Sequence, residues 1–180
     1  MPRFLDPDLQ HALAGDCRRC PALAESRERI SWGNGPQDAD LLADAGHGPE
    51  ECYFTNAVKC FPADGDGGNR EPTAEERANC RPHLRREIEA VEPRVVVPTG
   101  KHATKSTLAL DGRTIAGFLD CVLEPVECPD LGVTVVPLLH PSYQDVWLPR
   151  LGHDDESYRA AIAETLADHG TRRSREGSGR

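Results

Sequence analysis

Four cysteines constrain this chain of 180 residues more than any other feature, because they are spaced as metal ligands are. Cys17 and Cys20 form a Cys-X-X-Cys pair, while Cys60 and Cys80 enclose a loop rich in Gly and Asp. Two such thiolate pairs hold either a tetrahedral zinc ion or a four-iron cluster, [4Fe–4S], and the spacing alone does not separate the two. Because Cys60 closely follows a predicted strand, a metal there would anchor the loop that leaves that strand.

The other three cysteines, Cys52, Cys121 and Cys128, are predicted to be ordinary buried thiols. Seven cysteines without a signal peptide indicate a reducing compartment, where thiols bind metals or act in catalysis rather than form disulfides. We therefore expect a cytoplasmic protein.

The length predicts one domain over residues 1–170, followed by a disordered basic tail at 171–180. No apolar run approaches the roughly 20 residues that a membrane-spanning helix needs. We expect a monomer with no membrane partner.

The net charge of −9 argues at first against nucleic-acid binding, which depends on Lys and Arg. The chain holds only three lysines, Lys59, Lys101 and Lys105, among abundant Asp and Glu, a balance typical of proteins adapted to high salt. Our hypothesis is a halophilic protein, in which the acidity describes the solvated surface rather than the ligand.

Capping signals and apolar periodicity predict helices over residues 5–14 and 20–28, from Thr73 onward, after Gly100 to about Leu110, and over 155–169. Thr73 and Glu76 form a capping box. Pro82 is predicted to break or restart the helix that begins there.

Apolar runs predict strands at residues 53–55, 95–97 and 133–139, and the start of another at 38–42. Residues 61–72 read as a Pro/Gly/Asp loop. Apolar strands that alternate with helices predict an α/β fold with a mostly parallel sheet covered on both faces.

Asn56, Gly100 and His140 each follow one of these predicted strands. Ligands of such folds bind beyond the carboxyl ends of the strands, so we expect the three residues to converge on one site. Each alone is weak, because Asn often ends a strand and a His before Pro is usually structural. The turn of Pro141 and Ser142 could offer backbone N–H groups and a hydroxyl to a phosphate.

A phosphate-loop reading of Gly100 and Lys101 fails. That pattern requires Gly at position 95 and Ser or Thr at position 102, which are Val95 and His102 here. The sequence therefore argues against a nucleoside triphosphatase.

Taken together, these motifs resemble the iron–sulfur uracil-DNA glycosylases of the family-four type. The matching stretches include Cys17-Arg18-Arg19-Cys20-Pro21 and Asn56-Ala57-Val58-Lys59-Cys60, and others lie within residues 69–80, 93–103 and 140–142. The resemblance spans roughly residues 12–168 in order and implies a three-layer α/β/α domain. It also implies hydrolysis of the N-glycosidic bond of uracil in DNA, the first step of base excision repair.

By this resemblance, the cluster ligands are Cys17, Cys20, Cys60 and Cys80. Asn56 would read the uracil edge, because its amide can accept from N3–H and donate to O4, whereas cytosine presents the opposite pattern. His140 would stabilise the negative charge on the departing base. Gly100, Pro141 and Ser142 would hold the flanking phosphates.

One motif of the family is missing from this chain. Its members continue the first strand into a Gly-Glu-Ala-Pro-Gly-like loop that positions the attacking water, followed by an aromatic residue that stacks on the base. Here only the ten residues 43–52, with Gly46, Gly48 and Pro49, separate two predicted strands. A parallel crossover needs about a dozen or more. Either the first strand is frayed or lost, or the chain carries an internal deletion.

Asp38, Asp40, Asp44 or His47 could supply a substitute group that positions water. Two alternatives stay open beside an active glycosylase. One is a catalytically impaired remnant that keeps the cluster and binds DNA. The other is a zinc-stapled α/β module with no role at DNA.

Overall fold

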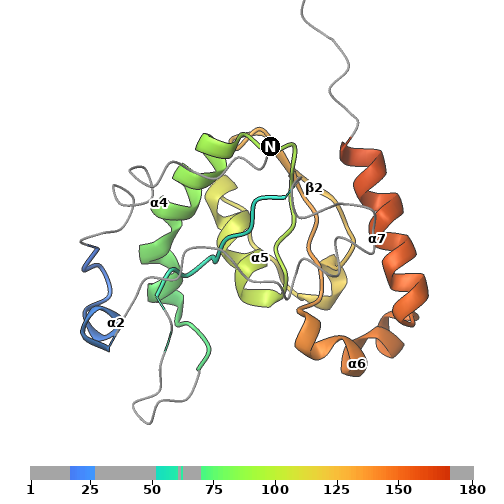
Figure 1. Ribbon diagram of the computed structural model, residues 1–180, viewed down its shortest axis with the longest axis horizontal. Coiled ribbons are helices and arrows are strands. Elements are labelled where there is room, and N and C mark those ends of the chain that lie inside the picture. Colours follow the sequence, from blue (N-terminus) through green and yellow to red (C-terminus); the bar gives the residue numbers. More distant parts are fainter. Residues whose placement is uncertain (1–16, 27–51, 61, 63–69, 171–180) are drawn as a thin grey trace, which may run out of the picture.

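The computed structural model describes residues 17–26, 52–60, 62 and 70–170, which form a small sheet flanked by helices (Figure 1). The helices are α2 (Pro21–Ser26), α4 (Ala74–Val91), α5 (Lys101–Leu108), α6 (Gln144–Trp147) and α7 (Asp155–Gly170). The strands are β1 (Val95–Val96), β2 (Val126–Cys128) and β3 (Val133–Val135). Short 3-10 turns are η2 (Ala109–Asp111), η3 (Leu119–Cys121), η4 (Pro141–Tyr143) and η5 (Leu148–Leu151). The predicted α/β class is confirmed.

The sheet has the order β1-β3-β2, with β3 in the middle. β3 pairs in parallel with β1 and antiparallel with β2, and an isolated bridge between Thr99 and Leu138 continues the parallel alignment. The strands predicted at 95–97 and 133–139 are thus confirmed in shorter form. The sequence did not predict β2, so the described sheet has one parallel and one antiparallel pair instead of a mostly parallel arrangement.

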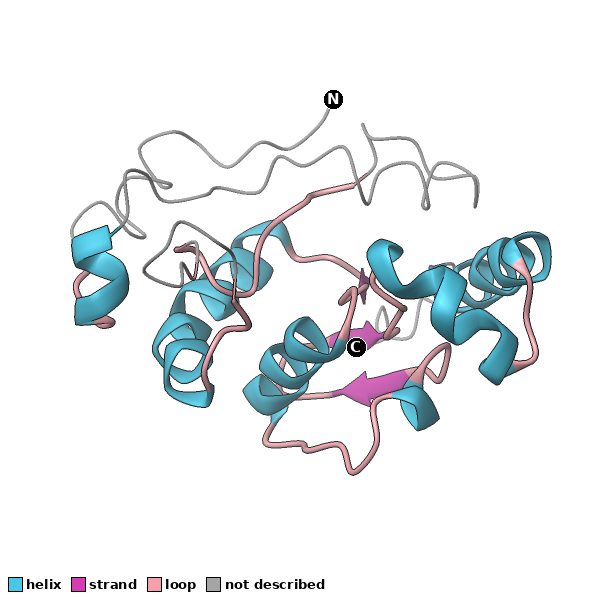
Figure 2. Cartoon of the chain, turned by 90° about the horizontal axis from the view of Figure 1, so that it is seen from below, coloured by secondary structure: helices cyan, strands magenta, loops and turns pink. Residues whose placement is uncertain are grey.

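Side chains that alternate along the central strand build a core on each face of the sheet. Val133 and Val135 pack with Leu84 and Ile88 of α4 and with Leu108 of α5. The other core holds Val136 and Leu138 from the segment of β3 and Tyr158, Ile162 and Leu166 from α7. Figure 2 shows the strands between these two groups of helices, which agrees with a three-layer arrangement.

Helix α4 begins at the predicted capping box. The Thr73 hydroxyl accepts from the Glu76 N–H at 3.1 Å, and the Glu76 carboxylate accepts from the Thr73 N–H at 2.8 Å. Arg70 adds a bidentate pair to the same carboxylate, at 2.8 and 2.6 Å. The Arg70 guanidinium is the main reason why the pKa of Glu76 falls to about 2.

Pro82 does not interrupt α4, contrary to the prediction. The helix runs without a break from Ala74 to Val91 and ends where Glu92 adopts a left-handed conformation. A proline inside a helix removes one hydrogen bond and costs about 3 kcal/mol. Burial of Leu84 and Ile88, on the turns that follow, offsets this cost, because each fully buried aliphatic side chain contributes about 1.5–3 kcal/mol.

Residues 53–55 form no strand, so that prediction is wrong. The helix predicted at 20–28 corresponds to the shorter α2, and those predicted after Gly100 and over 155–169 are α5 with η2 and α7. The helix predicted at 5–14, the strand start at 38–42, the proposed deletion up to residue 51 and the tail from 171 lie outside the described residues.

Across the described part of the chain, every helix is too short or too polar to be a membrane span.

We predict that Glu76→Gln lowers the free energy of unfolding at neutral pH by about 1–2 kcal/mol, because it weakens the cap and the Arg70 contact. The folded pKa of Glu76, about 2, lies below its ordinary value of 4.5. Its contribution is therefore complete above about pH 4.5 and is lost as the pH falls toward 2.

Urea unfolding across this pH range should show a shallower acid dependence in Glu76→Gln than in the wild type. Glu75→Gln, at the exposed neighbour in the same turn, is the matched control. Equal pH dependence in Glu76→Gln and the wild type would contradict the prediction.

Candidate functional site

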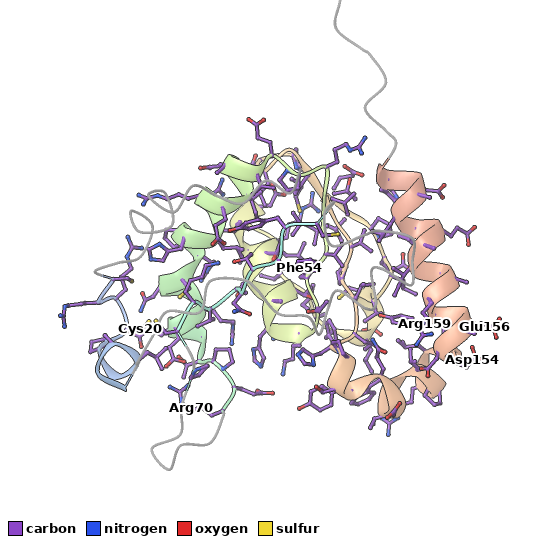
Figure 3. The ribbon with its side chains drawn as sticks, viewed as in Figure 1. Cys20, Phe54, Arg70, Asp154, Glu156 and Arg159 are labelled. Atoms are coloured by element: carbon purple, nitrogen blue, oxygen red, sulfur yellow. The ribbon has the colours of Figure 1, made fainter. Side chains whose placement is uncertain are left out.

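The four cysteines of the predicted metal site come from three separate segments. Cys17 and Cys20 are half-buried just before α2, Cys60 is buried at the end of the segment 52–60, and Cys80 is buried on α4. Figure 3 shows Cys20 on the side of α4 that faces α2, across the molecule from Asp154 and Glu156. All seven cysteines of the chain are free thiols.

The four cysteines are near enough for the charge of one thiolate to affect the pKa of another. Burial is the main reason why the pKa of Cys80 is raised, and the charges of Cys20, Cys60 and Cys17 add to it. Burial also raises the pKa of Cys20, with further contributions from Glu76, Cys60 and Cys17. Among the residues described, no three His, Cys, Asp or Glu side chains are grouped closely enough to hold a metal ion.

Polar N–H groups surround these sulfur atoms. The Asn79 amide lies 3.5 Å from the sulfur of Cys20 and donates to the Arg19 carbonyl at 2.8 Å. The His83 Nε2 lies 3.4 Å from the sulfur of Cys17. The Lys59 backbone N–H donates to Cys80 and lowers the pKa of that thiol, against the effect of burial. Such N–H contacts stabilise thiolates that carry a metal or a cluster.

Sequence reasoning missed the polar stripe on α4 that carries several of these groups. Glu76, Cys80, His83 and Glu87 are all buried and recur at intervals of four, three and four residues, so they share one side of the helix. The spacing of these four polar residues can be seen in the sequence, because they lie next to the apolar positions Leu84 and Ile88 that predicted the helix.

Asn56 lies on the segment 52–60, which runs from the central strands toward the N-terminal end of α4 (Figure 1, teal). Asn56 is exposed, whereas Lys59 and Cys60 of the same segment are buried. The Thr55 hydroxyl donates to Glu87 at 2.9 Å, and the Lys59 ammonium donates to both Thr55, at 2.5 Å, and Glu87. The segment is therefore fixed to α4 on both sides of Asn56.

His140 is exposed where the chain leaves the central strand, as predicted. Its Nδ1 accepts a hydrogen bond from the Ser142 N–H at 3.2 Å. In the neutral ring the proton is then on Nε2, which makes Nε2–H the donor that His140 can offer to a ligand. Tyr158 of α7 holds the residue before His140, because its buried hydroxyl accepts a hydrogen bond from the Leu139 N–H at 2.8 Å.

Gly100 and His140 lie together, as the sequence predicted for two strand ends. A Cβ atom added to Gly100 would lie 3.1 Å from the Cβ of His140, and the φ of Gly100 is +87°. Both observations favour glycine here, because a side chain would displace His140 and strain the backbone. The Gly100 N–H donates to the Leu138 carbonyl at 2.8 Å. Gly100 therefore leaves room for the side chain of His140.

The backbone donors of the turn after His140 are also used inside the protein. The Ser142 N–H donates to His140, and the Tyr143 N–H donates to the His140 carbonyl at 2.9 Å. This turn presents outward the exposed Ser142 hydroxyl, the half-buried ring of Pro141 and the exposed ring of Tyr143, which packs edge-on against His140.

Comparison with known proteins identifies the family. The family model described as "Uracil DNA glycosylase superfamily" matches residues 18–166, a range that holds Asn56, His140 and every cysteine of the quartet except Cys17. A type-5 uracil-DNA glycosylase of Pyrobaculum aerophilum is 42% identical over 118 residues, 66% of this chain and 47% of that protein.

Two type-4 uracil-DNA glycosylases are also similar. That of Archaeoglobus fulgidus is 34% identical over 128 residues, 69% of this chain and 61% of that protein. That of Thermotoga maritima is 36% identical over 104 residues, 58% of this chain and 50% of that protein. The matches thus span about half to three fifths of the length of these relatives. Because the family model covers most of the sequence, this chain belongs to the uracil-DNA glycosylase superfamily.

Proposed function

We propose that this protein hydrolyses the N-glycosidic bond of uracil in DNA and so starts base excision repair. The observation that carries the proposal is the geometry of His140, an exposed imidazole at a strand end with Nδ1 occupied and Nε2–H left as the donor. Relatives of this chain are named uracil-DNA glycosylases of types 4 and 5. A base in a duplex must be flipped out before such a site can reach it.

In this proposal the exposed Asn56 amide reads the edge of the flipped uracil, accepting from N3–H and donating to O4. As the bond between C1′ and N1 breaks, the electron pair moves onto the base, and His140 Nε2–H stabilises the charge on the uracil oxygen. Water then adds to C1′ and loses a proton, and the departing uracil anion gains one, so that the products are neutral uracil and an abasic sugar. We propose that one of four residues positions this water: Asp38, Asp40, Asp44 or His47. All four lie outside the described residues.

We further propose that Ser142 contacts a phosphate next to the flipped base through its hydroxyl, since its N–H is bonded to His140. Pro141 limits the conformations of that turn. Gly100 would act at the same strand end by keeping the space that His140 occupies.

A second candidate function is DNA binding without excision, because we predict that the sequence lacks the motif that positions water. A protein of this kind would bind uracil-containing DNA with an affinity that falls as salt rises, and release no base.

For the quartet we propose a [4Fe–4S] cluster. The chemistry of the donor set fits such a group, because the charges of Cys17, Cys20 and Cys60 help raise the pKa of Cys80, and a cationic centre would compensate the four thiolates. Cys17, Cys20, Cys60 and Cys80 would hold it. When bound, it would supply a covalent link between the start of α2, the Asn56 segment and α4. A zinc ion on the same thiolates is the alternative.

We also propose adaptation to high salt. Lys59, one of only three lysines, is buried, so Lys101 and Lys105 alone place lysine charge near the surface of a chain whose net charge is −9. Salt screens the mutual repulsion of surface carboxylates, since the Debye length falls from about 10 Å at 0.1 M to about 3 Å at 1 M.

The free thiols agree with our further expectation of a cytoplasmic protein. A single domain over residues 1–170 and a monomeric state remain predictions.

We predict that His140→Ala lowers the single-turnover rate of uracil release from single-stranded DNA by about 100-fold or more. Binding of the same DNA should change little, because the loss concerns charge that develops only as the bond breaks. His169→Ala, at the far end of α7, is the matched control and should keep the wild-type rate.

An unchanged rate in His140→Ala would contradict the assigned role. If the wild-type protein binds the DNA in a salt-dependent manner but releases no uracil, the binding function holds instead.

The cluster proposal predicts that anaerobically purified protein absorbs visible light and contains about four irons per chain. Cys80→Ser should lose both the colour and the iron. Cys128→Ser, at a buried cysteine outside the quartet, should keep them. Colourless protein with one zinc per chain would establish the alternative, and colourless protein without metal would overturn both.

The salt proposal predicts a melting temperature that rises steadily from low to high potassium chloride. A melting temperature indifferent to salt, with a normal response to sucrose as the control for general solute effects, would contradict it.

A further inference from the structure

We propose that a buried network of Thr55, Lys59 and Glu87 positions Asn56 for base recognition. The inference rests on the proposed function and adds three positioning residues to it. None of the three would touch the substrate.

The network closes a small ring in the chain. Thr55 and Lys59, four residues apart, bond to each other at 2.5 Å, and both bond to the same oxygen of Glu87. Residues 56–58 therefore form a loop whose two ends, Thr55 and Lys59, are both bonded to Glu87. Asn56 is the first of these residues and is exposed, so the network anchors the backbone on both sides of an exposed amide.

The anchor itself is rigid. Glu87 is 1% exposed and lies on α4 between Leu84 and Ile88, which pack against the sheet. The Lys59 backbone N–H also donates to Cys80, on the same helix. Thus the side chain and the backbone of Lys59 both bind α4, and the loop has little freedom to slide along it.

Energetic cost argues that the network has a task besides stability. Lys59 and Glu87 are each 1% exposed, and the free-energy cost of removing two charges from water can exceed the gain from their mutual attraction. Burial lowers the pKa of Lys59, and the charge of Glu87 acts in the opposite direction. An apolar pair of similar volume would hold the core as well or better. What an ion pair with a shared hydroxyl adds is a defined geometry.

Asn56 needs such support because no strand supplies it. Residues 53–55 carry no regular secondary structure, and loops hold side chains less accurately than helices or strands do. A recognition amide must be held to within about 0.5 Å. The network transfers the rigidity of α4 to the segment that carries Asn56.

The test replaces both charges with apolar groups of similar length. Lys59→Met alone or Glu87→Leu alone leaves one buried charge without its partner and is expected to destabilise the protein. The double variant K59M/E87L removes both and should melt near the wild-type temperature. A second variant, Thr55→Val, removes only the shared hydroxyl. The matched control is K105M/E89L, which makes the same two changes outside the network.

We expect K59M/E87L to lower the single-turnover rate of uracil release by about 100-fold, the cost of a displacement of about 1 Å. Asn56→Ala should lower the wild-type rate by a similar factor but change the rate of K59M/E87L little, because the network acts through Asn56. Rate losses that multiply in the triple variant, or a wild-type rate in K59M/E87L, would overturn the inference. K105M/E89L should retain the wild-type rate.

Amide hydrogen exchange provides a readout that does not depend on catalysis. The peptide that covers residues 53–59 should exchange faster in K59M/E87L and in Thr55→Val than in the wild type, while α7 exchanges at the same rate in all. If the wild-type protein releases no uracil, the proposed function fails, and this measurement alone decides whether the network holds the segment. Unchanged exchange over 53–59 would contradict the inference.

Discussion

Leu84 and Ile88 bury one side of α4 against the sheet, and the position of this helix determines where the groups on its adjacent side lie. That side presents Cys80 to the cysteine quartet and Glu87 to the segment that carries Asn56. The capping box and Arg70 fix the residue at which α4 begins, and this sets the position of each later residue along the helix axis. The cysteine quartet and the segment that carries Asn56 therefore both depend on the packing of α4 against the sheet.

The opposite end of the candidate site depends on α7 in a similar way. Tyr158 packs in the second core and accepts the Leu139 N–H, which holds the strand end just before His140. Gly100 then sets the distance between the two strand ends by offering no side chain. Its backbone N–H is bonded to the Leu138 carbonyl, so the imidazole of His140 is held from two sides.

Local sequence patterns predicted many of the helices and strands of the described residues. The capping box at Thr73, the apolar runs of β1 and β3 and the periodicity of α7 each report short-range preferences, and these were confirmed. Pro82 was misjudged because its cost is local, whereas the packing that offsets it is tertiary. The hairpin strand β2 was missed because the charged Glu127 interrupts its apolar pattern, so Val126–Cys128 does not form an apolar run as β1 and β3 do. The convergence of Gly100 and His140 followed from topology alone. The ion pair of Lys59 and Glu87 did not, since residues 28 positions apart meet only through the packing of α4.

We propose above all that this chain removes uracil although we predict that it lacks the family motif that positions water. Mass spectrometry of a single-stranded oligonucleotide with one uracil, after incubation with excess wild-type protein, tests it most directly. The account predicts release of one free uracil per strand and an abasic product whose mass has fallen by that of the base. An oligonucleotide of unchanged mass, bound by the protein but intact, would contradict it.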